Sequence, residues 1–283
     1  MRTDLRHSGF MAVDCRVALL AGVLAGLLAL PARPWGQEPP ETASPAGILP
    51  QQEELYYRAE WRLVHAGNVR LSWSHAGENG GWRAQLRLQS AGLVSRLYRV
   101  DNEYVVLMDA GLCAASSTLR AHEGRKRREV SVRFDGAGGK ASYVERDPVR
   151  DVVVATHEVD IPACVHDVLG GLYRLRAMRV EPGQVVYIPV SDGKKSVAVR
   201  VEAQQREKLR IGQNAYQTIR YEAFLFNNVL YRRSGRLFLW LTDDERRLPV
   251  QIRVRLPFYI GTVTLELRPE RGAMAEPSSG GCP

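Results

Sequence analysis

Alternation of apolar and polar residues runs through most of this chain and restricts its fold more than any other feature. Residues 250–256 read Val-Gln-Ile-Arg-Val-Arg-Leu, with every second side chain apolar. Successive side chains of a β-strand point to opposite faces, so this pattern predicts strands with one buried and one solvated face, as in antiparallel sheets. The same period is found in segments 55–63, 69–73, 82–88, 130–134, 197–201 and 263–267.

Turn-forming residues separate several of these segments, and no strand–helix–strand alternation is present in the sequence. Residues 65–68, His-Ala-Gly-Asn, follow the first segment and predict a turn there. Further turns are predicted at Asp135-Gly136, Gly138-Gly139, Asp192-Gly193 and Asn227-Asn228. We therefore expect antiparallel strands joined by hairpins, and the sequence argues against a doubly wound fold of parallel strands.

One segment has helical spacing instead. Between Val165 and Met178 the apolar residues fall three or four positions apart, which predicts an amphipathic helix. Gly170 and Gly171 weaken it, at about 1 kcal/mol each, but allow it to pack closely against another surface. We expect a mainly β fold, an antiparallel curled sheet (half-barrel or sandwich) with this one helix packed on it.

The N-terminal residues have the pattern of a cleaved signal peptide, which we assign to residues 1–36. Arginines precede residues 17–30, an uncharged apolar run shorter than the roughly twenty residues that span a bilayer. An uncleaved anchor helix is the alternative. The signal predicts a protein exported to the periplasm, or peripheral to the membrane, of a Gram-negative-type envelope. No transmembrane span is expected in the mature chain.

Composition divides the rest of the chain into three parts. Residues 37–52 are rich in proline and predict a flexible lead-in, and residues 269–283 predict a disordered tail. Residues 53–268 contain no obvious linker and are expected to form a single β-rich domain. The formal charge of +8 favours anionic surfaces in general, but export from the cytoplasm excludes nucleic acid as a partner.

The cysteines permit one disulfide and give no sign of a metal site. Cys113, Cys164 and Cys282 remain after the predicted signal peptide. A Cys113–Cys164 bridge is compatible with an oxidising compartment, and two small buried thiols are the alternative. The sequence has no Cys-x-x-Cys pair, and its histidines lack metal-ligand spacing. We therefore predict no metal and no cofactor.

Several short motifs together resemble a known family. They are Gly67, Asp167, residues 172–176 (Leu-Tyr-Arg-Leu-Arg), Pro182-Gly183, residues 240–249 (Trp-Leu-Thr-Asp-Asp-Glu-Arg-Arg-Leu-Pro) and Ile260-Gly261. Their order and spacing resemble the exported bacterial family called domain of unknown function 3108, over about residues 53–268. Gly170-Gly171 depart from the Leu/Ser more usual there. The resemblance implies an envelope location and a β-rich half-barrel or sandwich with a helix, and it implies no activity.

The carboxylates of this chain do not form a convincing catalytic set. Asp243 and Asp244 lie between two predicted strands, where a hairpin turn is the simplest interpretation. Asp167, next to His166, is placed to cap the predicted helix. Its alternative role as a general base needs a nucleophile, and no Gly-x-Ser-x-Gly elbow is present. We predict no catalytic residue.

Two basic features remain. Arg176 lies on the predicted helix, and a buried arginine there requires a partner, for which Asp167, Asp243 and Asp244 are the candidates. The alternative is that Arg176 binds an anionic headgroup. Residues 125–128, Arg-Lys-Arg-Arg, predict a solvated hairpin tip, with contact to anionic lipid or polysaccharide as the next interpretation.

Binding of an apolar or amphiphilic envelope ligand, such as a lipid, by a non-catalytic carrier module is the favoured function. The ligand contacts expected from this hypothesis are Arg176, Asp167, Trp61 and Trp73. A cavity is expected to be lined by Trp61, Trp73, Trp82, Tyr57 and Phe238. A structural or assembly role with an envelope protein partner, through an exposed edge strand, is the alternative. A hydrolase is the third hypothesis.

Overall fold

The computed structural model describes residues 49–77, 80–258 and 261–268, which all belong to the compact unit Thr42–Pro283. The predicted signal peptide 1–36 and tail 269–283 lie outside the described residues. The strands are β1 Gln52–Trp61, β2 Val64–His75, β3 Trp82–Ser90, β4 Val100–Met108, β5 Ala114–Glu123, β6 Lys126–Asp135, β7 Lys140–Asp147, β8 Val152–Asp160, β9 Val185–Ser191, β10 Ser196–Ile211, β11 Asn214–Ala223, β12 Arg236–Thr242, β13 Pro249–Arg255 and β14 Thr262–Leu267. The helices are α1 Gly92–Leu97 and α2 Val168–Arg176.

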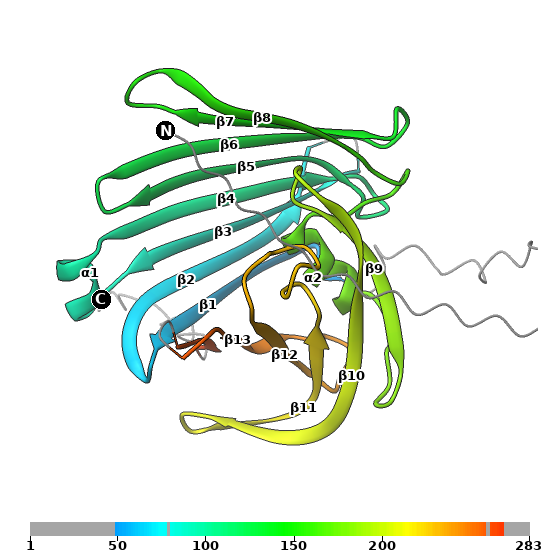
Figure 1. Ribbon diagram of the computed structural model, residues 1–283. Coiled ribbons are helices and arrows are strands. Elements are labelled where there is room, and N and C mark those ends of the chain that lie inside the picture. The colour runs from blue at the N-terminus through cyan, green and yellow to red at the C-terminus, as the bar shows by residue number, and fades with distance from the viewer. Residues whose placement is uncertain (1–48, 78–79, 259–260, 269–283) are drawn as a thin grey trace, which may run out of the picture. The chain divides into compact units, whose positions relative to one another are not determined.

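All fourteen strands form one antiparallel sheet in the order β8-β7-β6-β5-β4-β3-β2-β1-β14-β13-β12-β11-β10-β9. Figure 1 shows the sheet curling so that β1–β8 form one wall and β9–β14 the other, with α2 between them. The edge strands β8 and β9 do not pair, so the sheet is not closed into a barrel. The half-barrel expectation is confirmed, and a single continuous sheet rules out the sandwich.

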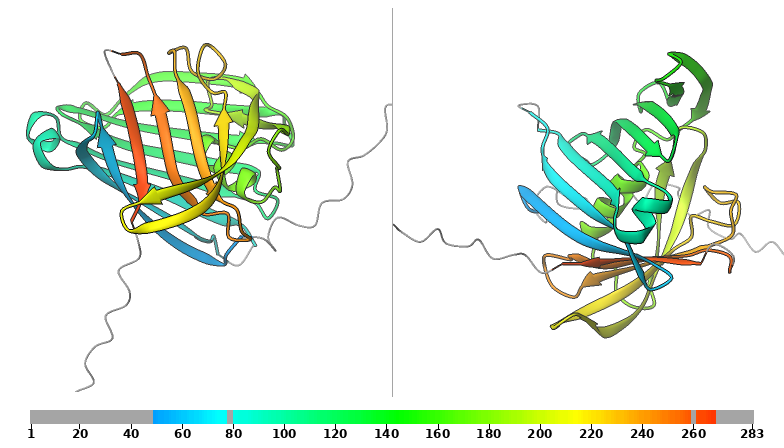
Figure 2. Two further views of the ribbon diagram at one scale, coloured as in Figure 1. Left: turned by 90° about the horizontal axis from the view of Figure 1, so that it is seen from below. Right: turned by 90° about the vertical axis from the view of Figure 1, so that its left-hand side faces the viewer.

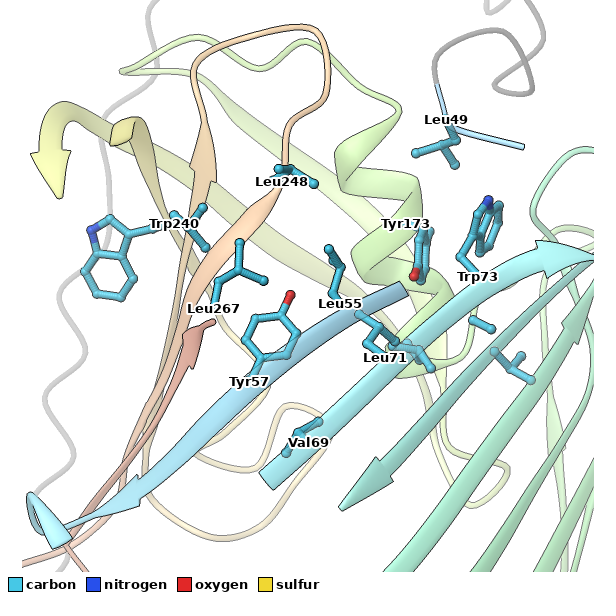
Figure 3. Packing of buried hydrophobic residues seen from close by; sticks show 14 of the residues in the cluster. Leu49, Leu55, Tyr57, Val69, Leu71, Trp73, Tyr173, Trp240, Leu248 and Leu267 are labelled. Atoms are coloured by element: carbon cyan, nitrogen blue, oxygen red, sulfur yellow. The ribbon is translucent and has the colours of Figure 1, made fainter. Parts of the chain in front are cut away.

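Pairing of inward-facing residues at the centre of the sheet shows why the alternation produces this fold. Leu55 of β1 is opposite Leu71 of β2, and Tyr57 is opposite Val69 on one side and Leu267 on the other. All five side chains are buried, and Figure 3 shows them within one packed cluster. Burying such a row on one face fixes the register, because a slip by one residue would expose it.

The first hairpin reverses earlier than the sequence predicts. Its turn is Arg62 and Leu63, both with positive φ, and the predicted turn at 65–68 lies inside β2. A Cβ on Gly67 would lie 2.4 Å from the carbonyl oxygen of Gln89 on β3, so glycine is needed here for close strand approach. Glycine inside a strand has this use as well as its use in turns, and the sequence alone does not distinguish them.

The predicted helix is shorter at both ends than residues 165–178. His166 lies outside it and forms a parallel bridge with Val190 of β9. A Cβ on Gly170 would lie 3.1 Å from the sulfur of Met108 on β4, which explains the small residue. The second helix, α1, was not predicted and has no buried residue. No helix among the described segments is long and apolar enough to span a membrane.

The described fold includes the end of the predicted flexible lead-in. Leu49 is buried in the largest core cluster. The carbonyl oxygen of Pro50 accepts a hydrogen bond of 2.9 Å from the indole nitrogen of Trp73. Since both contacts are made before residue 53, residues 49–52 are part of the β-rich unit, and the rest of the lead-in lies outside the described residues.

Candidate functional site

An apolar cavity of about 340 Å³ lies between α2 and the concave face of the sheet. Strands β1–β4 and β9–β14 all contribute to its walls, and α2 forms a further wall. Three tyrosines are the only lining residues with a polar side-chain atom, and no lining residue is charged. Representative lining residues are Tyr57, Leu71, Leu172, Val201, Leu239 and Leu265.

The tyrosine hydroxyls add little polarity to this cavity. Tyr57 donates a hydrogen bond of 2.8 Å to the backbone carbonyl of Pro249. Tyr104 donates one of 2.7 Å to Oδ2 of Asp167. Burial raises the pKa of both phenols well above their usual range, so both stay protonated and neutral. The cavity is therefore suited to hydrocarbon and offers few polar partners.

Part of the cavity lining is accessible to solvent. Val199, Val201 and Leu175 form a fully buried part of the lining, whereas Tyr104 and Leu172 are half-buried. The half-buried lining residues also include Leu86, Phe226, Leu237, Ile252, Val254 and Leu265. A sealed core would bury all of these side chains, so the lining forms a hydrophobic groove that a ligand can enter.

Asp167 holds the helical wall of the cavity in place. Its carboxylate accepts hydrogen bonds from the backbone nitrogens of Leu169 (3.1 Å) and Gly170 (2.6 Å), and from Tyr104. Asp167 is thus the N-cap of α2, as the sequence predicts. It is fully buried, and burial raises the pKa of its carboxyl group. Because it does not line the cavity, its role is to position the helix, not to contact a ligand.

Replacing Asp167 tests this positioning role. Asp167→Ala should lower the free energy of unfolding at pH 7 by about 1–3 kcal/mol, because buried donors lose their acceptor. Asp167→Asn keeps a capping oxygen and should cost much less. The raised folded pKa means that the folded state holds the proton more tightly than the unfolded chain. The carboxyl's contribution to stability should therefore increase as the pH falls through the folded pKa towards 3.8.

Urea unfolding at several pH values measures both effects. The wild-type protein should gain stability relative to Asp167→Asn on acidification. A wild-type advantage that instead shrinks on acidification would mean that Asp167 is stabilised as a charged group.

Arg176 is buried and fully paired, but not with a predicted partner. Its guanidinium binds the carboxylate of Glu53 in a bidentate arrangement, with Nη1–Oε2 at 2.6 Å and Nη2–Oε1 at 3.0 Å. It also donates to the carbonyls of Arg246 and Arg247. The predicted partners Asp167, Asp243 and Asp244 were therefore wrong. Asp167 instead caps α2, Asp243 pairs with Arg206, and Asp244 accepts hydrogen bonds within its own turn. Arg176 does not line the cavity, and each of its guanidinium nitrogens already makes a hydrogen bond, which disfavours the headgroup alternative.

Asp243 and Asp244 lie in a hairpin turn, as the sequence predicts. Asp244 accepts hydrogen bonds from the Thr242 hydroxyl and the Arg247 backbone nitrogen, within the β12–β13 connection. Asp243 pairs with Arg206 at 2.7 Å. These carboxylates serve local structure, and the described residues contain no group of three or more His, Cys, Asp or Glu able to hold a metal ion.

The aromatic residues are arranged differently from the prediction. Trp73 is buried in a stack between Trp82 (4.7 Å) and Tyr173 (4.1 Å), and Figure 3 shows Trp73 beside Tyr173. Trp61 is 40% exposed at the end of β1. Neither these tryptophans nor Phe238 line the cavity, and Tyr57 is the one expected aromatic residue that does.

The aliphatic residues of β9–β13 that line the cavity were not predicted from the sequence. Val199 and Val201 belong to a segment whose alternation predicts a strand, but alternation does not show which inner face is left unfilled. That depends on the distance between the two walls and α2, which the sequence does not reveal.

A disulfide joins Cys113 and Cys164, whose Cα atoms lie 5.0 Å apart. Cys113 is in the turn between β4 and β5, and Cys164 precedes α2. The adjacent backbone nitrogen of Ala114 donates to the carbonyl of Val165. The bridge therefore attaches the segment before α2 to the β4–β5 turn of the sheet.

Comparisons with known proteins identify a family and two similar structures. Residues 56–268 match the family model described as protein of unknown function (DUF3108). Among solved structures, the chain is similar to a β-barrel-like protein of domain of unknown function DUF1849 from Brucella abortus, with 9% sequence identity and a TM-score of 0.49, over 76% of this chain and 94% of that chain. It is also similar to a DUF1089 family protein from Pseudomonas aeruginosa, with 14% identity and a TM-score of 0.31, over 67% of this chain and 90% of that chain. No curated protein matches the sequence.

The family match covers most of the chain and spans the sheet from β1 to β14. It includes Asp167, which caps α2, and residues 240–249, which span the β12–β13 connection. The resemblance found in the sequence is therefore confirmed, and this chain belongs to the DUF3108 family of proteins of unknown function.

Proposed function

We propose that the protein is a non-catalytic binding or carrier module for an apolar or amphiphilic ligand of the cell envelope. The supporting observation is the cavity, whose lining is hydrocarbon except for three tyrosine hydroxyls. Its volume of about 340 Å³ is within the range of small-molecule sites, roughly 300–1,000 Å³. A charged substrate would lose its hydration there without gaining partners.

The presence of both buried and half-buried residues in the lining favours an amphiphile in particular. An alkyl chain would lie against buried residues such as Val199 and Val201, where it gains about 0.8 kcal/mol for each CH₂ removed from water. Its polar end would then remain near half-buried lining residues such as Tyr104 and Tyr231. This arrangement keeps the charged or polar group hydrated while burying the chain.

A charge placed in the cavity tests the proposal. Leu237 lines the cavity and is half-buried, so Leu237→Asp should fold while making the groove polar. Binding of dansyl-labelled undecanoic acid, followed by fluorescence, should weaken by about tenfold or more, equivalent to about 1.4 kcal/mol. Leu107→Asp is the matched control, since Leu107 is 38% exposed on β4 and does not line the cavity. Equal binding by both variants would refute the cavity as the site.

We propose that the protein works outside the cytoplasm, in the periplasm or peripheral to a membrane. The proposal rests on the sequence pattern of residues 1–36, which lie outside the described residues. N-terminal sequencing of protein from its own host should find a start between Arg33 and Gln37. An intact Met1 or Met11 on the bulk of the protein would contradict export.

The assembly role remains the second candidate because of β8. This strand is one edge of the sheet, and among the described strands it pairs with β7 alone. It exposes Val152, Val153 and Val154, each about half accessible or more. An unpaired edge of this kind can accept a strand from a partner protein. Native mass spectrometry distinguishes the two candidates, because a carrier would retain a small amphiphile and an assembly factor would retain a protein.

A further inference from the structure

Four neighbouring connections lie at one end of the half-barrel and form what we call the rim: residues 62–63, 91–99, 124–125 and 256–258. Hydrogen bonds link neighbouring connections, either directly or through β2. Arg62 donates to the carbonyl of Phe258 at 2.8 Å, and Ala91 donates to Ala66 at the start of β2. The nitrogen of Gly124 donates to the carbonyl of Arg99. The rim is therefore a continuous surface built by three hairpins and α1.

The rim exposes large apolar side chains. Leu63 is 92% exposed, Phe258 94% and Leu97 79%, and Leu93 and Tyr98 are also exposed. Helix α1 has no buried residue, so its leucines contribute nothing to the core of this chain. Figure 2 shows α1 projecting from the sheet at this end. Apolar side chains concentrated at turns in this way indicate a surface that another apolar phase covers.

The charges of the rim identify that phase. Its described residues include four arginines, Arg62, Arg96, Arg99 and Arg125, and no aspartate or glutamate. All four are exposed. Guanidinium groups bind phosphate through paired donors, and basic residues beside exposed leucines and aromatics are typical of proteins that lie at an anionic membrane interface.

The opposite end of the half-barrel has a different character. Its described connections contain aspartates and glutamate at positions 109, 135, 243, 244 and 245. None of the exposed large apolar residues lies in these described connections, and Leu112 in the β4–β5 turn is fully buried. The β7–β8 turn, at the same end as the rim, exposes Val149 but contains Asp147 and Asp151. Exposed apolar and basic groups without carboxylates are thus found at the four connections of the rim, not at every set of turns.

The rim also lies close to two half-buried residues of the cavity lining. Val254, a half-buried lining residue, is on β13 four positions before Phe258. Leu265 pairs with Ala59, two positions before Trp61 on β1. A surface that docks through the rim would therefore be close to the part of the cavity that solvent reaches.

We propose that the rim docks the protein onto a membrane surface rich in anionic phospholipid, with Leu63, Leu97 and Phe258 entering the acyl boundary and the arginines contacting phosphates. This goes beyond ligand binding in the cavity. A membrane is favoured over a protein partner because the arginines surround the leucines without any carboxylate among them, which suits a uniformly anionic surface.

Cosedimentation of the mature protein with vesicles tests the proposal. The protein should bind vesicles of equal parts phosphatidylcholine and phosphatidylglycerol, bind phosphatidylcholine alone at least tenfold more weakly, and dissociate as salt is raised. The triple variant Leu63→Asp/Leu97→Asp/Phe258→Asp should bind the anionic vesicles at least tenfold more weakly, as should Arg96→Glu/Arg125→Glu. These side chains are exposed, so the thermal unfolding midpoint should stay that of the wild type.

Two controls separate the outcomes. Val154→Asp places the same charge on an exposed apolar residue of the edge strand β8, outside the four connections of the rim, and should bind vesicles like the wild type. Leu237→Asp impairs the cavity and should also bind vesicles normally, so failure of the carrier function would not imitate failure of docking. Absence of wild-type binding, or a folded triple variant that binds as well as Val154→Asp, would overturn the proposal and leave the rim as a protein interface.

Discussion

Replacing Arg176 by alanine should lower the free energy of unfolding by about 3–5 kcal/mol, because the Glu53 carboxylate would be left nearly buried without its partner. Two backbone carbonyls, of Arg246 and Arg247, would lose a donor at the same time. The guanidinium also lies 5.2 Å from the Tyr173 ring centroid. Since Glu53 is on β1 and Arg176 ends α2, the pair ties the helix to the middle of the sheet.

Urea denaturation of matched variants measures this loss. Arg127→Ala is the control, since Arg127 is exposed on β6 and should change stability by only about 0.5 kcal/mol or less. Glu53→Ala should destabilise about as strongly as Arg176→Ala, and the double variant should cost less than the sum of the two. If Arg176→Ala were as stable as Arg127→Ala and instead abolished ligand binding, Arg176 would be a ligand contact.

Removing the Cys113–Cys164 disulfide should have an effect of similar size. The two cysteines are 51 residues apart in sequence. In the loop-entropy model, closing a loop of that length in the unfolded chain contributes about 4 kcal/mol to stability. The double variant Cys113→Ala/Cys164→Ala should therefore unfold at clearly lower urea concentration than the wild type.

A reducing agent provides the matched comparison. Cys164 is exposed, so dithiothreitol should bring the wild-type unfolding midpoint down to that of the double variant and leave the variant itself unchanged. Equal midpoints for the oxidised wild type and the double variant would show that the bridge does not stabilise the folded protein.

Local features of the sequence were enough to predict several parts of this structure. Alternation in segments such as 250–256 predicted the strands, because only one face of each is buried. Asp167 was predicted as a helix cap from its position alone, and the cap is made by backbone groups two and three residues away. The turn at Asp243-Asp244 is equally local, since Asp244 bonds to Thr242 and Arg247.

Features that depend on distant contacts could not be predicted in this way. Arg176 and Glu53 are separated by 123 positions, and nothing near either residue marks the other as its partner. Gly67 was interpreted as a turn residue, although the approach of β3 is what excludes a side chain there. The aromatic residues were expected around a cavity, but Trp73 and Trp82 fill the core by stacking on each other and on Tyr173.

The sequence by itself therefore determined that this chain forms an antiparallel β fold with a capped helix, and its motifs identified the family. Only the tertiary structure decided that the sheet stays open, that α2 and the two walls leave an apolar cavity, and that Arg176 pairs with Glu53. The physical reason is the range of the interactions. Strand alternation and capping act over a few residues, whereas the curvature of a fourteen-stranded sheet and the space left beneath a helix depend on side chains packed from across the whole chain.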